Sequence, residues 1–196
     1  MVAEEEVGPE RNAQLTRKTK ILHVGVIRPA RIVAAVSMAV GGTAGGGGFS
    51  VVLSGDFVIA SDKAKFVSAY TSSGLTPDGS STYYLAKHVG LLRAKELMLT
   101  NRVLTADEAQ AWGLVNKVVP TETVIDEARA MAQCIASGPT KAFGGVKRLL
   151  DTAFSDGLET QLDRETRSIA DMMRTTDGPA GIAAFLAKET PRFEGE

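Results

Sequence analysis

Ten residues with the sequence GGTAGGGGFS, numbers 41–50, form the first segment whose composition suggests chemistry. Six of them are glycine, the residue that loses most backbone freedom on folding. A glycine-rich turn leading into a helix lets a ligand approach the unpaired N–H groups of the helix N-terminus, which carry a partial positive charge. The run therefore suggests a site where backbone amides stabilise an anion or a developing oxyanion.

Three other interpretations of the glycine run can be weighed against its flanks. A flexible linker is disfavoured because the apolar residues MAV precede the run and FSVVL follows it. A phosphate loop is unsupported because no lysine follows the glycines and no three of them fit G-x-G-x-x-G. A tight crossing of helix and sheet that needs small residues only for packing stays open at this point.

A carboxylate, Asp78, lies in the segment TPDGSS, residues 76–81. Pro-Asp-Gly is also a turn tripeptide, so these residues alone favour a turn over a catalytic base. The chain has two histidines, His23 and His88, which are far apart in sequence. The chain therefore has too few histidines to favour a Ser–His–Asp triad or a histidine-rich metal site, and no metal is expected.

Composition and charge limit the classes of protein to which this chain can belong. The 196 residues are 44% hydrophobic and 23% charged, enough for one globular core with a helical appendage. A net charge of −1 offers no basic field for nucleic acid, and no segment has the roughly 18 apolar residues of a membrane span. A single cysteine, Cys134, and no apolar leader in residues 1–20 predict a cytoplasmic protein.

The elements that position these residues alternate between strand and helix. The apolar pattern predicts a helix over 22–33, a buried strand within 34–40 and a helix over 49–54. Strands are expected at 57–61 and 65–69, a loop at 71–81 and a strand at 114–119. The remaining helices are expected at 80–90, 91–100, 122–137, 141–154, 158–173 and 178–188, with a further helix that begins at a Thr105–Glu108 capping box. This order predicts a polar lead-in at 1–20, an α/β core at 21–137 and a helical region at 138–196.

Residues 40–66, VGGTAGGGGFSVVLSGDFVIASDKAKF, resemble the signature of the crotonase family, the enoyl-CoA hydratase/isomerase superfamily. The family pattern is N-G-x-A-x-G-G-G, an aspartate about ten residues later, and a strand with I-A-S. Here Asp56 and the strand residues 59–61 follow the glycines, and the match runs from about residue 22 to the end. The resemblance implies an α/β ββα spiral core, a C-terminal helical trimerisation region and acyl-CoA substrates, with Gly47 supplying an oxyanion-hole amide.

Two side chains depart from the pattern of the family's hydratases. Those enzymes use two glutamates, and by the resemblance Ser50 and Tyr70 stand at these positions, where they would shape or polarise the pocket. Some relatives place their working acid at the position of Asp78, among them enoyl-CoA isomerases and 4-chlorobenzoyl-CoA dehalogenase. A carboxylate in an apolar acyl pocket takes up a proton more readily, because desolvation disfavours its charged form. The resemblance therefore favours Asp78 as base.

The sequences near the two ends of the chain lead to two further expectations. The family segment A-G-x-D-[LM], which gives a second oxyanion amide and much of the CoA pocket, has no counterpart in residues 1–20, so the N-terminal part of the core is expected to be missing. Residues 181–193, GIAAFLAKETPRF, resemble the family segment near CoA, where Phe185 and Lys188 would contact the nucleotide. A packed phenylalanine and a solvated lysine are the alternative.

Two functional hypotheses follow. The first is an acyl-CoA enzyme of fatty acid metabolism, a homotrimer or hexamer that isomerises a double bond with Asp78 as base and the Gly47 amide holding the thioester oxygen; CoA enters as part of the substrate and no other cofactor is expected. The second is a catalytically impaired crotonase-like scaffold or fragment. A hydratase (a lyase) with unusual active-site residues is the remaining alternative.

Overall fold

The computed structural model describes residues 21–25 and 35–196, so the lead-in at 1–20 lies outside the described residues. Contacts divide the described chain into two compact units. The first contains residues 21–24 and 36–130, and the second contains residues 131–196 with Gly25 and Ala35. Among the described residues, no helix combines the length and the apolar character needed to cross a membrane.

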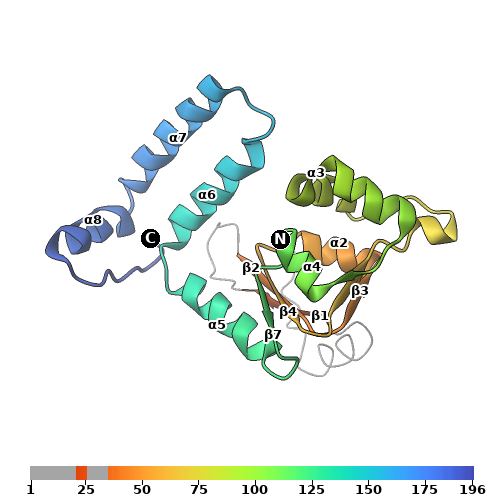
Figure 1. Cartoon of the computed structure of the whole chain (residues 1–196). Coiled ribbons are helices and arrows are strands. Elements are labelled where there is room, and N and C mark those ends of the chain that lie inside the picture. Colours follow the sequence, from red (N-terminus) through yellow and green to blue (C-terminus); the bar gives the residue numbers. More distant parts are fainter. Residues whose placement is uncertain (1–20, 26–34) are drawn as a thin grey trace, which may run out of the picture. The chain divides into compact units, whose positions relative to one another are not determined.

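Two small sheets form the centre of the first unit (Figure 1). The larger has the order β1-β2-β4-β7, made of β1 Ile21–Gly25, β2 Val36–Val40, β4 Phe57–Ser61 and β7 Lys117–Val119. The smaller has the order β3-β5-β6, made of β3 Thr43–Gly45, β5 Lys65–Val67 and β6 Leu104–Thr105. β4 is parallel to β2 and β7, β3 is parallel to β5, and β6 is antiparallel to β5.

Strands β2 and β4 of the larger sheet are buried on both faces, which explains the continuous apolar runs in their sequences. Along β2, Met38 and Val40 enter the main hydrophobic core, whereas Ala39 joins Ile59 in a second cluster. This alternation follows the two-residue period of a strand. The second cluster also contains Val119, Val124 and Ala128, so α5, Val124–Ala136, covers that face.

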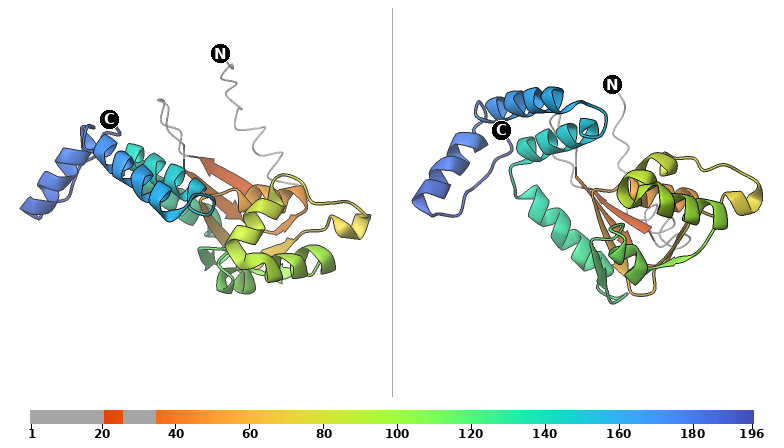
Figure 2. Two further views of the ribbon diagram at one scale, coloured as in Figure 1. Left: turned by 90° about the horizontal axis from the view of Figure 1, so that it is seen from above. Right: turned by 45° about the horizontal axis from the view of Figure 1, so that its top comes forward.

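Helices cover the main core. Helix α2, Gly47–Leu53, packs against β3 and against α3, Ser81–Thr100, as Figures 1 and 2 show. The ring of Phe49 on α2 lies 5.9 Å from that of Phe66 on β5. Helix α4, Ala106–Ala111, packs beside β6 and β7, and the 3-10 turn η1 covers Thr71–Ser73.

The second unit contains the end of α5 and three further helices. These are α6 Thr140–Thr152, α7 Leu158–Met172 and α8 Asp177–Ala187. Helices α6 and α7 lie side by side in Figure 1 and pack on each other. The carboxylate of Asp177 at the start of α8 accepts hydrogen bonds from the N–H groups of Glu194 (2.8 Å) and Gly195 (2.9 Å), which fastens the C-terminal segment to this helix.

The structure confirms most of the expected elements and corrects two parts of the prediction. Residues 21–25 form a strand, so the helix expected over 22–33 is wrong where the chain is described, because pairing with β2 overrides the local pattern; residues 26–34 lie outside the described residues. Strand β3 lies inside the glycine run, and α2 begins at Gly47 rather than at residue 49. The expected break between two helices at residue 90 is confirmed, because Gly90 has the non-helical angles φ 78° and ψ 163° and kinks α3 there.

Candidate active site

The glycine run makes the turn from β3 into α2. Gly46 precedes the helix with φ 52° and ψ −124°, a conformation that favours glycine. Its N–H donates to the carbonyl of Val67 on β5 (3.1 Å), and its carbonyl accepts the N–H of Ser50 (3.1 Å). Gly47 is exposed and begins the helix, where the first N–H groups have no partner within the helix.

Ser50 lies in the first turn of α2 and is only 2% exposed. Its Oγ is 3.1 Å from the carbonyl oxygen of Asp78, 3.4 Å from that of Gly46 and 3.2 Å from the hydroxyl of Tyr70. A buried hydroxyl needs hydrogen-bond partners, and these three groups supply them. Ser50 therefore joins the glycine turn to the loop that carries Asp78.

The hydroxyl of Tyr70 donates a hydrogen bond of 2.6 Å to Oδ1 of Asp78. A Cβ built on Gly47 would lie 3.9 Å from the same hydroxyl, so Tyr70 borders both the carboxylate and the start of α2. Burial, followed by the hydrogen bond to Asp78, raises the pKa of the Tyr70 phenol above its ordinary value.

The loop before α3 holds the backbone of Asp78. Its carbonyl accepts hydrogen bonds from the Oγ of Ser50 (3.1 Å), the Oγ of Ser81 (2.9 Å) and the N–H of Ser81 (3.2 Å). Gly79 follows with φ 58°, and a Cβ built there would lie 2.9 Å from the Cβ of Ser50. The turn that Pro-Asp-Gly indicates is therefore present, and it brings the loop against α2.

The side chain of Asp78 is exposed, which differs from the apolar burial that the sequence analysis expects. The reason is local, since most residues of the loop are exposed, including Leu75 at 62%. Desolvation by the described residues therefore does not explain a basic role for Asp78. The hydrogen bond from Tyr70 is the contact that the structure shows for its carboxylate.

Four of the six predicted site residues come together in the first unit: Gly47, Ser50, Tyr70 and Asp78. The other two, Phe185 and Lys188, belong to the second unit. Phe185 is 80% exposed on α8, and Lys188 caps the end of that helix with φ 57°.

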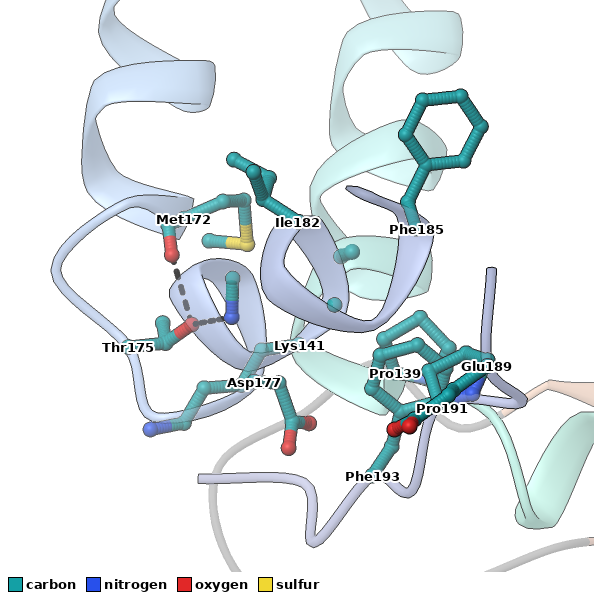
Figure 3. A pocket seen from close by; sticks show the side chains of 13 residues that line it. Pro139, Lys141, Met172, Thr175, Asp177, Ile182, Phe185, Glu189, Pro191 and Phe193 are labelled. Atoms are coloured by element: carbon teal, nitrogen blue, oxygen red, sulfur yellow. Dashed lines mark hydrogen bonds between the residues drawn. The ribbon is translucent and has the colours of Figure 1, made fainter. Parts of the chain in front are cut away.

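Phe185 borders a pocket of about 470 Å³ within the second unit (Figure 3). Met172, Ile182 and Phe185 lie along the upper side in this view, and Pro139, Pro191 and Phe193 lie along the lower side. The lining is mostly apolar, with Lys141, Asp177 and Glu189 as its charged members. The sequence analysis did not predict this pocket.

Sequence reasoning also missed the backbone that orients Tyr70. Ala69, directly before it, has φ 62°, an uncommon value for a residue with a Cβ. Such strain persists only where the surroundings hold it, and it often occurs at functional sites. Nothing in the sequence VSAY predicts this conformation.

Among residues 21–25 and 35–196, no cluster of side chains has the composition of a metal site.

Comparison with known proteins identifies the family to which the chain belongs. The family model for enoyl-CoA hydratase/isomerase matches residues 7–196. The chain belongs to this family. It is 39% identical over 171 residues to 1,2-epoxyphenylacetyl-CoA isomerase of Escherichia coli strain K12, covering 87% of this chain and 65% of that protein. It is also 34% identical over 185 residues to 4-chlorobenzoyl coenzyme A dehalogenase-1 of an Arthrobacter species, covering 93% of this chain and 67% of the relative.

A crystal structure supports the same assignment at the level of the fold. An enoyl-CoA hydratase from Polaromonas sp. JS666 superposes with a TM-score of 0.76 at 36% identity, covering 80% of this chain and 61% of that one. The predicted crotonase-like α/β class is therefore confirmed, as is the family resemblance. The chain spans less than two thirds of the Escherichia coli isomerase and of the Polaromonas structure.

Proposed function

We propose that this protein acts on an acyl-CoA thioester and moves a carbon–carbon double bond of the acyl group, with Asp78 as the base. The observation that carries the proposal is the 2.6 Å hydrogen bond from Tyr70 to Asp78, because the same hydroxyl borders Gly47 at the start of α2. A carboxylate and a backbone donor thus share one small site. The relatives named for CoA thioesters support the substrate class.

The proposed reaction needs one proton to leave and return. The Asp78 carboxylate takes a proton from C2 of a 3-enoyl thioester, and the electron pair moves onto the thioester oxygen as a dienolate. The protonated Asp78 then returns the proton at C4, which leaves a 2-enoyl thioester. A positioned general base of this kind contributes about 10²- to 10⁴-fold to a rate.

The thioester oxygen requires a donor while it carries negative charge. The N–H of Gly47 is proposed for this task, since Gly47 is exposed and lies at the positive end of α2. One such donor contributes about 10²- to 10³-fold to a rate. Glycine also leaves space beside the amide, because it has no Cβ.

Isomerisation is favoured over hydration because of the residues at the glutamate positions of hydratases. Ser50 and Tyr70 stand there by the resemblance, and neither side chain is a carboxylate. Ser50 is buried and engaged with three neighbouring oxygens, so it does not hold a water as a base would. Asp78 is the carboxylate in direct contact with this network.

The proposal extends to CoA and to other copies of the chain. Exposed Phe185 and Lys188 on α8 are proposed to contact the nucleotide of CoA, which enters as part of the substrate rather than as a cofactor. Family resemblance suggests a homotrimer or hexamer, and apolar side chains exposed on α6, α7 and α8 support association. A Phe185→Ala variant should then bind CoA more weakly in calorimetric titration.

The test of the catalytic proposal is Asp78→Asn in the full chain. Ultraviolet absorbance of the conjugated product follows conversion of a trans-3-enoyl-CoA series. We expect the variant to lose about 10²- to 10⁴-fold in kcat, because the amide cannot accept the proton. Asp126→Asn is the matched control, since it removes a carboxylate that is 81% exposed on α5.

Two outcomes would overturn the proposal. Full activity of the Asp78→Asn variant would remove Asp78 from the reaction. A wild-type chain that binds no CoA thioester in calorimetry would favour the non-catalytic scaffold. Retained CoA binding together with lost turnover is the result that supports a base.

A further inference from the structure

The geometry points to Tyr70 as a positioning residue for Asp78. Its hydroxyl holds Oδ1, which leaves Oδ2 as the oxygen that exchanges the proton, and Ser50 holds the hydroxyl in turn. This inference rests on the proposed function of Asp78 as base. It adds that the reaction depends on a three-residue chain, Ser50–Tyr70–Asp78, rather than on one carboxylate.

The direction of the hydrogen bonds in this chain follows from counting hydrogens. The phenol of Tyr70 has one hydrogen, and the short contact of 2.6 Å assigns it to Oδ1 of Asp78. In the 3.2 Å contact between Ser50 and Tyr70, the phenol oxygen can therefore only accept, and the single hydroxyl hydrogen of Ser50 is shared between this contact and the carbonyls of Asp78 (3.1 Å) and Gly46 (3.4 Å). No hydrogen-bond donor among the residues that the structure describes lies against Oδ2.

Asp78 needs such a partner because its side chain is exposed. The hydrogen bonds from Ser50 and Ser81 fix its backbone carbonyl, but they leave the carboxylate free to rotate. Catalysis by a base requires that the reacting oxygen be held close to the proton it removes. Tyr70 supplies this constraint from a different element, the segment that follows β5.

Tyr70 is itself held firmly. The positive φ of Ala69 sets the direction in which the chain enters Tyr70, and the hydroxyl lies beside Gly47 and Ser50. Burial and the neighbouring carboxylate raise the pKa of the phenol, so it keeps its hydrogen through neutral and mildly alkaline pH. It therefore remains a hydrogen-bond donor to Asp78 over that range of pH.

Among the described residues, the side chains that form hydrogen bonds with Asp78 are those of Tyr70, Ser50 and Ser81, and none of them carries a charge at neutral pH. Within the described part of the chain, Asp78 forms no ion pair. Removal of the Tyr70 hydroxyl should thus leave the carboxylate of Asp78 without a hydrogen-bond donor among the described residues.

The test is Tyr70→Phe, which keeps the ring and removes the hydroxyl. We expect kcat to fall by about ten- to a hundredfold, the equivalent of one hydrogen bond to a charged group, with little change in KM. Tyr83→Phe is the control, since Tyr83 is 53% exposed on α3 and its hydroxyl contacts Lys87.

A spectroscopic measurement tests the contact without substrate. Ultraviolet titration of the phenols in the wild type, Tyr70→Phe and Asp78→Asn isolates the signal of Tyr70. Removing the charge of Asp78 should lower the pKa of Tyr70 relative to the wild type, although burial still keeps it raised. An unchanged titration would show that the two side chains do not interact.

The outcomes separate the inference from the function on which it rests. Loss of activity in Asp78→Asn with an unchanged kcat in Tyr70→Phe would overturn the positioning role and leave the base in place. Activity retained in Asp78→Asn would overturn the proposed function. Should Tyr70→Phe fail to fold, Ser50→Ala provides the second variant, and it should lower kcat with little change in KM; an unchanged kcat would overturn the role of the three-residue chain.

Discussion

Gly79 is the residue at which the site tolerates least change. It combines a positive φ of 58° with a close approach to α2, because a Cβ there would lie 2.9 Å from the Cβ of Ser50. Gly79→Ala should destabilise the protein by about 1–3 kcal/mol and also lower turnover, since the loop that holds Asp78 must move. Urea unfolding midpoints and kcat measure the two effects.

Gly74 offers a matched control in the same loop. It has φ 70°, but a Cβ built there meets nothing within 4 Å. Gly74→Ala should therefore show the cost of backbone strain alone, about 1–2 kcal/mol. If Gly79→Ala lowers the free energy of unfolding no more than Gly74→Ala does, the close approach of Gly79 to Ser50 does not contribute to stability.

The sequence suggested the site residues singly, but it did not show how they meet. Ser50, Tyr70 and Asp78 came from a resemblance, and their hydrogen bonds depend on backbone angles at Ala69 and Gly79. A positive φ at an alanine leaves no trace in residue types. The exposure of Asp78 was equally hidden, because burial depends on which distant segments cover a loop.

At the scale of elements, the capping box of α4 was read correctly from its residues. The N–H of Glu108 donates to the Oγ1 of Thr105 (3.3 Å), and the carboxylate of Glu108 accepts the N–H of Thr105 (3.0 Å). Thr105→Ala should cost about 1 kcal/mol in unfolding free energy, measured by urea denaturation. Such a signal is local, so the sequence alone suffices to find it.

The capping box also predicts a pH dependence of stability. The hydrogen bond from the backbone of Thr105, followed by the contacts with its hydroxyl and with Arg102, lowers the pKa of Glu108 in the folded state. This stabilisation is present above the ordinary pKa of a glutamate carboxyl and is lost as pH falls through the lowered folded value. Thermal melts of Glu108→Gln and the wild type should differ at neutral pH and converge in acid. A difference that stays constant with pH would contradict this.

Elements formed by distant pairing were harder to predict than locally capped ones. Strands β2 and β4 have apolar runs that mark them as buried. Strand β3 carries one buried side chain, Ala44, between exposed residues of a glycine run, and β6 has two residues. Both strands form because they pair with β5, and neither has an alternating apolar pattern of its own from which a strand could be predicted.

At the scale of the whole molecule, the helices of the second unit expose apolar side chains that another protein surface could cover. On α7, Leu158, Leu162 and Ile169 recur at helical spacing and are 75%, 52% and 67% exposed. No residue of α7 is buried, and Leu150 on α6 and Leu186 on α8 are also exposed. Large apolar side chains exposed in such number are typical of a surface that another molecule covers.

We expect a second copy of the chain to cover these faces, and light scattering coupled to size-exclusion chromatography should find an oligomer. Ile169→Glu should shift the mass toward the monomer and lower the melting temperature, because a charge cannot be buried unpaired in an apolar interface. Glu165→Gln on the same helix is the control and should leave the mass unchanged. A wild-type chain that stays monomeric at every concentration would show that these helices do not mediate self-association, and the exposed Leu158 and Ile169 would then need a different partner.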